Sequence, residues 1–178
     1  MKNSDKKENR FRSLSIKILG LIPAILGVLA LLGWVFDLPI LASIFTGKIP
    51  MAPSTAIMFI LFGLIMYFHL SSNIIIHRFK IIFSSIGILT PLSLFFLSMN
   101  GLLLDAEQLG FKITGIVEGV NTGHMSPVTA IVFILVGLAI LIMLISDRRK
   151  IAVIFAFATS VLVVFSSTIL TVAYLVGL

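Results

Sequence analysis

Five stretches of the chain are apolar enough, and about long enough, to cross a lipid bilayer. They are Ile16–Phe36, Met51–Leu70, Ile81–Met99, Met125–Ile145 and Ile151–Val176. A helix of about 20 residues crosses the roughly 30 Å hydrocarbon core of a bilayer. Because 59% of the 178 residues are hydrophobic and only 11% are charged, a water-soluble domain of this size could not cover its apolar surface. We therefore expect an all-α, polytopic transmembrane helical bundle with five spans.

The lysines and arginines of the chain fall mainly on one side of this predicted bundle. Eleven belong to the N-terminal tail and to the loops after the second and fourth segments, whereas only Lys48 and Lys112 belong to the other loops. The positive-inside rule places the richer side in the cytoplasm. We therefore expect a multi-pass protein of the cell membrane, with a polar cytoplasmic tail over residues 1–15. We expect the first ten residues of this tail, MKNSDKKENR, to be unstructured. This explanation of the net charge of +6 also argues against a nucleic-acid partner.

Two stretches of the predicted bundle repeat one another. MAPSTAIMFILFGL at Met51–Leu64 and MSPVTAIVFILVGL at Met125–Leu138 are identical at ten of fourteen positions, at an offset of 74 residues. Both are predicted to begin helices that run from outside to inside, which makes the repeat parallel rather than inverted. We expect the transmembrane domain, residues 16–178, to contain helical hairpins over about 16–70 and 81–145, followed by a fifth helix over 151–176.

The residues that the two copies share form the candidate site. They are Pro53, Thr55, Ala56 and Gly63 in the first copy, and Pro127, Thr129, Ala130 and Gly137 in the second. Proline suits the first position of a helix, and alanine and glycine allow close helix packing in lipid. Packing is one interpretation. The other is a pocket near the outer leaflet, into which two helix N-termini would direct their partial positive charge.

The predicted outer loops are longer and more apolar than the inner ones, so we expect an interfacial helix or a packed cap over residues 100–124. Four acids lie on this side: Asp37, Asp105, Glu107 and Glu118. We expect them at the solvated surface, with a shared cation or ligand site as the alternative.

Several kinds of chemistry have no support in the sequence. Without cysteine there is no thiolate metal site and no cysteine nucleophile. His69, His77 and His124 are too far apart in the sequence to predict a compact ligand cluster, so we assign them structural or interfacial roles rather than metal or haem binding. We predict no catalytic, cofactor-binding or metal-binding residue, no cofactor and no enzymatic activity in this chain.

The doubled pattern M-x-P-x-T-A-x-x-F-x-L-x-G-L resembles the multi-pass membrane N-terminal sensory regions of prokaryotic signalling proteins. Those regions precede histidine kinase, PAS or diguanylate cyclase modules. The resemblance implies a membrane-embedded sensory or input domain in signal transduction. In such proteins a further helix returns the chain to the cytoplasm before a kinase or cyclase effector, and the lack of that helix here predicts either a sensor without an output or an incomplete chain. The partners expected are the lipid bilayer and either a second copy, as a homodimer, or a signalling effector.

Two other functions remain open at the level of sequence. An accessory or scaffold membrane subunit would have the same pattern of apolar helices. A small transporter component is less favoured, because transporters carry polar or charged groups near the middle of the membrane and this chain has almost none there.

Overall fold

The computed structural model describes residues 2–43, 49–102, 105–111, 116–117, 120–146 and 149–176, and it is almost entirely helical. The predictions for Lys48, Lys112, Glu118 and Arg148 lie outside the described residues. The helices are α1 (Lys2–Val35), α2 (Pro39–Ala42), α3 (Pro53–Tyr67), α4 (Ile74–Met99), α5 (Pro127–Ile145) and α6 (Arg149–Val176). A single 3-10 turn, η1 (Asp105–Gln108), and two antiparallel two-residue strands, β1 (Ile116–Val117) and β2 (Val120–Asn121), lie between α4 and α5.

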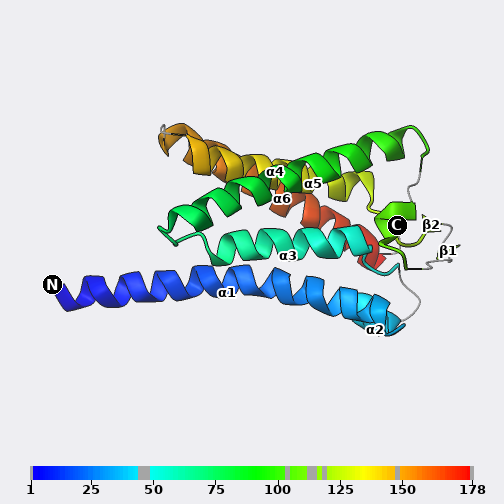
Figure 1. Ribbon diagram of the computed structural model, residues 1–178, viewed down its shortest axis with the longest axis horizontal. Coiled ribbons are helices and arrows are strands. Elements are labelled where there is room, and N and C mark those ends of the chain that lie inside the picture. The colour runs from blue at the N-terminus through cyan, green and yellow to red at the C-terminus, as the bar shows by residue number, and fades with distance from the viewer. Residues whose placement is uncertain are drawn as a thin grey trace.

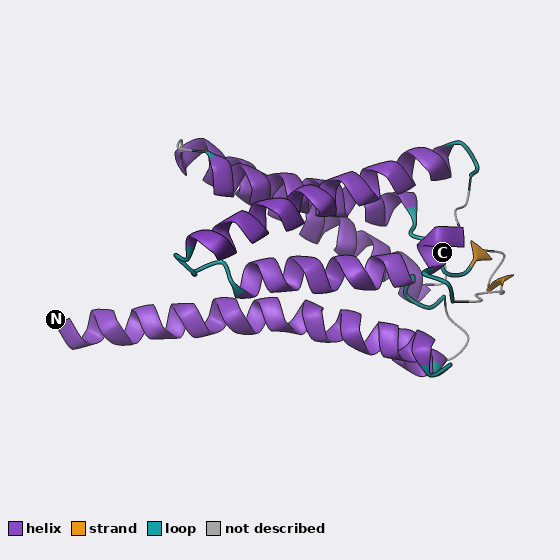
Figure 2. Ribbon diagram, viewed as in Figure 1, coloured by secondary structure: helices purple, strands orange, loops and turns teal. Residues whose placement is uncertain are grey.

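The long helices run back and forth between two ends of the bundle (Figure 1). The N-terminus and the loop between α3 and α4 lie at one end, which we call the N-terminal end. Helix α2, η1 and both strands lie at the other, which we call the cap end. The loops and short elements gather at these two ends, and the middle of the bundle consists of helices alone (Figure 2).

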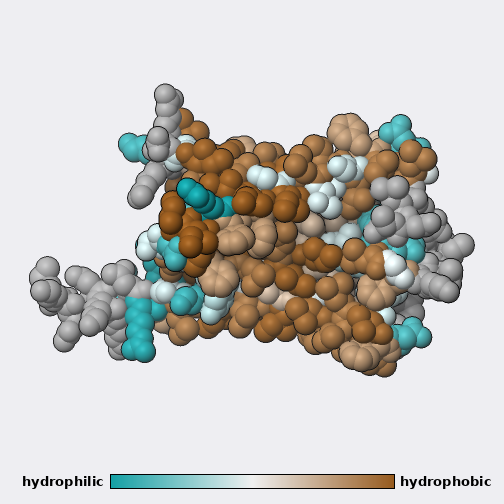
Figure 3. Space-filling view, in the orientation of Figure 1, coloured by the Kyte–Doolittle hydropathy of each residue, from teal (hydrophilic) through white to brown (hydrophobic). Residues whose placement is uncertain are grey.

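Within the described parts of the chain, four helices are long and apolar enough to cross a membrane. They are Arg10–Val35, Ile74–Met99, Pro127–Ile145 and Lys150–Ile169. A broad hydrophobic surface covers the middle of the bundle, and hydrophilic residues lie toward its ends (Figure 3). The chain is therefore a helical protein suited to a membrane.

The second predicted segment, Met51–Leu70, is helical only from Pro53 to Tyr67, which is a shorter helix of 15 residues. Turns follow at residues 68–70, where the Lys80 ammonium donates hydrogen bonds to the carbonyl oxygens of His69 (3.2 Å) and Ser71 (3.4 Å). These bonds satisfy two carbonyl groups in the turn that follows the helix.

The N-terminal tail differs from the expectation of an unstructured segment, because α1 is continuous from Lys2. Lysine, glutamate and arginine are good helix formers, and extending a helix that has already formed is easier than nucleating one. The apolar part of α1 thus carries the polar residues as a helical extension beyond the bundle (Figure 1). In the same way α4 begins before the predicted Ile81, at Ile74, because the Asn73 side chain caps it by accepting from the Ile75 N–H at 2.8 Å.

Helices α1 and α3 pack so closely that glycine is required between them. A Cβ on Gly20 would lie 2.6 Å from the backbone nitrogen of Tyr67, and one on Gly63 would lie 2.6 Å from the carbonyl oxygen of Gly20. A Cβ on Gly27 would overlap the carbonyl oxygen of Ala56. The two backbones touch, which is how helices gain dispersion energy in lipid. We call α1 with α3 the first helix pair.

Helices α4 and α5 form the second helix pair. The Ser84 hydroxyl of α4 donates to the carbonyl oxygen of Gly137 in α5 at 3.0 Å, and a Cβ on Gly137 would lie 2.6 Å from the Ile88 side chain. Helix α6 packs against α5 and buries Ala152 and Thr159. Many of its other apolar side chains, such as Phe157, are exposed, as expected for a helix that faces lipid.

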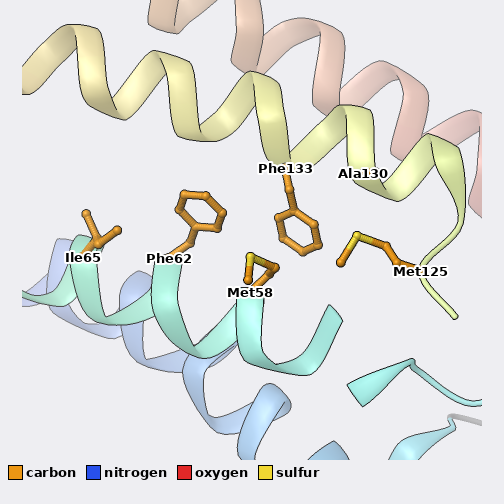
Figure 4. Packing of buried hydrophobic residues seen from close by; sticks show 6 residues of the cluster. All are labelled: Met58, Phe62, Ile65, Met125, Ala130 and Phe133. Atoms are coloured by element: carbon orange, nitrogen blue, oxygen red, sulfur yellow. The ribbon is translucent and has the colours of Figure 1, made fainter. Parts of the chain in front are cut away.

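The two pairs meet through large side chains between α3 and α5, shown in Figure 4. The Phe62 and Phe133 rings stack with centroids 5.8 Å apart. The other members of this buried cluster are Met58, Ile65, Met125 and Ala130. Phe62 also reaches the second pair at Gly87, where a Cβ would lie 2.6 Å from its ring. We call this contact the aromatic seam.

Candidate functional site

A buried glutamate lies where the cap meets the membrane helices. Glu107, in η1, has a side chain only 5% exposed. Its Oε1 accepts a hydrogen bond from the Ser54 hydroxyl at 2.9 Å and another from the backbone N–H of Met125. Its Oε2 lies 3.1 Å from Nδ1 of His124. Burying a carboxylate costs several kcal/mol unless it is well bonded, and three donors here offset that cost.

Both ring nitrogens of His124, the histidine of this cluster, have a hydrogen-bond partner. Nε2 of His124 lies 3.3 Å from Nε2 of Gln108, which can only donate. With the Gln108 amide in this orientation, Nε2 of His124 accepts from Gln108 and Nδ1–H donates to Glu107. Because Gln108 follows Glu107 in η1, one short turn fixes both the carboxylate and the orientation of the ring.

The backbone around η1 explains how a single turn can reach this position. Gly101 (φ 70°) precedes it, and Leu109 (φ 55°) and Gly110 (φ 81°) follow it, all in the left-handed region. Gly123 (φ 88°) lies just before His124. Glycine adopts these angles at little cost, whereas Leu109 is a non-glycine residue in a sparsely populated conformation. The chain thus reverses sharply on both sides of Glu107.

Glu107 connects the starts of the two repeated stretches. Ser54 lies in the first turn of α3, and Met125 directly precedes Ser126, the N-cap of α5. The carboxylate lies against the starts of both helices, where the helix dipoles favour negative charge. It is a polar link between the first and second helix pairs.

The shared residues of the repeat take different positions in the two copies. Pro53, Thr55 and Ala56 are buried at the start of α3. Ala130 is buried in α5, whereas Pro127 and Thr129 are partly exposed. Gly63 and Gly137 each lie where their helix contacts the preceding long helix.

The two copies also differ in how their first turns are capped. The Ser126 hydroxyl accepts from the Thr129 N–H at 3.1 Å and lies 2.8 Å from the Thr129 hydroxyl. Ala52, at the equivalent position, provides no side-chain cap to α3. Both prolines stand at the first helical position, as predicted.

The expectation that the outer acids lie at the solvated surface is wrong for Glu107. Asp37 is exposed, as expected, but Glu107 is buried because donors from α3 and from the start of α5 converge on it. Sequence reasoning also missed Ser54 and Gln108. The signal that the sequence offered was the position of Glu107 in a semi-apolar loop, because the apolar side chains of such a loop pack against the rest of the protein.

The histidines occupy opposite ends of the bundle. His124 belongs to the Glu107 cluster, and His69 lies near Lys80 at the N-terminal end. Over the residues that the structure describes, no three histidine, aspartate or glutamate side chains are grouped so that they could hold a metal ion.

The geometry of the Glu107 cluster suits a bridge between elements rather than a nucleophile. The Ser54 hydroxyl donates to Oε1 of Glu107, and His124 binds Oε2 of the same carboxylate. The cluster joins η1 to the two helix pairs.

No protein-family model, curated protein or solved structure matches the chain.

Proposed function

We propose that the chain is a membrane-embedded sensory or input domain of a signal-transduction protein, and that its cap end is the input surface. The observation that carries this proposal is the position of Glu107. A residue of the long connection between α4 and α5 binds Ser54 at the start of α3 and Met125 at the start of α5. Anything that displaces the cap therefore acts directly on two helices that run through the bundle.

In this proposal the N-terminal end is cytoplasmic and the cap end lies outside the cell membrane. The distribution of lysine and arginine supports this orientation. We count α3 as a fifth crossing, because it lies in the chain between α1 and α4, and both of these run from the N-terminal end to the cap end (Figure 1). Its 15 residues span about 22 Å at 1.5 Å per residue, and the residues that flank it complete the distance.

The internal repeat is part of the same proposal. Gly63 meets Gly20 in the first helix pair, and the equivalent Gly137 accepts from Ser84 in the second. Phe59 and Phe133, which are also equivalent, touch each other across the two pairs. Contact between equivalent residues is expected when two units are related by a twofold axis, here along the membrane normal. A parallel repeat places both helix starts at the input surface.

Signal transfer would use two arrangements of the helices with similar energy, one of which the stimulus favours. A membrane-soluble or amphipathic stimulus suits the apolar surroundings of the cap, in which Leu102 and Leu109 are exposed. The expected output partner is a histidine kinase, PAS or diguanylate cyclase module, and a second copy is the expected neighbour in the membrane.

The test uses the complete protein that the gene encodes, with its output measured in membranes. One variant replaces residues 100–124 by a short linker, and a second carries Thr55→Val and Thr129→Val. We expect both to be inserted normally and to give an altered output. If output and its response are unchanged in both variants, the domain is an anchor or scaffold, and the sensory proposal fails.

A further inference from the structure

We propose that Glu107 is a latch that sets the relative position of the two helix pairs. The role of this latch in signalling rests on the proposed function, but its mechanical role follows from the packing alone. In the closed arrangement, which the structure represents, the carboxylate holds the starts of α3 and α5 together. When η1 withdraws it, the two pairs can move against each other as units.

Each helix pair is built to move as one body. In the first, Gly20 and Gly63 bring the backbones of α1 and α3 into contact, and Gly27 does the same against Ala56. In the second, the Ser84 hydroxyl binds the Gly137 carbonyl in the middle of α4 and α5. Interfaces with so little space transmit displacement rather than absorb it.

The aromatic seam between the pairs is of another kind. It is formed by long side chains, with Phe62 and Phe133 stacked and Met58 and Met125 beside them. Methionine adapts to irregular gaps, and the Phe62 ring meets Gly87 with the far end of a rotatable side chain. The seam therefore keeps the pairs together through side chains that can rotate, whereas the first helix pair is held by backbone against backbone.

Glu107 adds directional hydrogen bonds between the two helix pairs, which the aromatic seam does not have. Its bond to Ser54 belongs to the first pair, and its bonds to Met125 and His124 belong to the start of the second. Hydrogen bonds to a charged group are the stronger class, and their geometry is specific. Three of them at one carboxylate set the separation and the register of the two helix starts.

Release of the latch would be an all-or-none event. If η1 moved away, the Ser54 hydroxyl, the Met125 N–H and His124 would together lose their acceptor in a buried site, where unpaired donors are costly. Partial withdrawal is thus unfavourable. Gly101 and Gly110, on either side of η1, have open space around them and left-handed backbone angles, and they are the pivots for the movement.

The experiment measures distances between pairs of spin labels in the full chain, reconstituted in lipid nanodiscs without any stimulus. The chain has no cysteine, so labels can be placed freely. Labels on Arg12 and Ile145 report the separation of the two helix pairs at the N-terminal end. Labels on Arg12 and Leu70 report the first pair alone, and labels on Arg78 and Ile145 report the second.

We expect Glu107→Gln and Glu107→Ala to shift or broaden the distance between the pairs by about 1–2 Å, the size of helix shifts at packed interfaces. The distances within each pair should not change. The matched control is Asp37→Asn, which removes an exposed acid at the same end of the bundle. Asparagine tolerates the left-handed backbone of Asp37 (φ 53°), so this variant should leave all three distances unchanged.

An unchanged distance between the pairs in both Glu107 variants would overturn the latch. If the within-pair distances also scatter, the milder Ser54→Ala decides, because it removes one of the three donors. A shift between the pairs in that variant supports the latch, and no shift refutes it. These distance measurements do not depend on a signalling output. The latch proposal can therefore be supported even if loop replacement leaves signalling intact and the sensory proposal fails.

Discussion

The rings of Phe59 and Phe133 meet edge to face, with centroids 5.7 Å apart and planes at 87°. The two residues stand 74 positions apart and occupy the same place in the two repeated stretches. One comes from α3 and the other from α5, so the contact joins the first helix pair to the second. Phe133 is the more central ring, because it also stacks on Phe62.

Leucine substitutions at these two positions should show energetic coupling. An edge-to-face pair contributes about 0.5–1.5 kcal/mol beyond the area it buries. We expect Phe59→Leu and Phe133→Leu to destabilise the protein together by less than the sum of their separate effects, by that amount, in unfolding measurements on detergent-solubilised protein. Phe157→Leu, on the exposed face of α6, should show no coupling to Phe133→Leu. Strict additivity at Phe59 and Phe133 would contradict the contact.

Adding one methyl group between α1 and α3 should destabilise the first helix pair. The Cβ of Gly63→Ala would meet the Gly20 carbonyl oxygen and the Ala24 backbone, neither of which can rotate away. We expect a loss of roughly 1–3 kcal/mol, typical of overpacking, seen as a lower melting temperature. Val28→Ile adds the same volume on an exposed face of α1 and should be neutral. Equal melting temperatures for the two variants would mean that the helices do not touch at Gly63.

The N-cap positions of α3 and α5, residues 52 and 126, can be tested by exchanging alanine and serine between them. Ser126→Ala removes the hydroxyl that accepts from the Thr129 N–H and should cost about 1 kcal/mol. Ala52→Ser places a hydroxyl at the equivalent position, where the backbone has nearly the same angles, and should stabilise α3. Ser93→Ala, at an exposed serine within α4, is the control for loss of a hydroxyl. Destabilisation by Ala52→Ser would show that the buried start of α3 has no room for the cap.

Cysteine labelling tests the proposed orientation. Ser72 lies exposed at the N-terminal end, and Leu102 lies exposed near the cap. In intact cells a membrane-impermeant thiol reagent should label Leu102→Cys and spare Ser72→Cys. Both should react once the membrane is permeabilised. Labelling of Ser72→Cys in intact cells would invert the proposed topology.

The sequence by itself determined the approximate positions of the long helices and the starts of α3 and α5. Apolar stretches of about 20 residues satisfy their backbone hydrogen bonds in lipid by forming helices, so each predicted segment overlaps one long helix of the structure. Pro53, Pro127 and Ser126 act within one turn of their own positions, which is why their roles could be read locally. The length of α3 and the helical tail of α1 could not be predicted in this way, because both depend on residues outside the apolar part of the predicted segment.

Only the tertiary structure decided the role of Glu107. An isolated carboxylate belongs in water, and the semi-apolar loop around Glu107 did not indicate which donors would meet it. Its burial depends on Ser54, which is 53 residues away, and on Met125, which is 18 residues away. The free energy of placing a charge inside the protein is set by donors that the fold brings together, and no local stretch of sequence contains them.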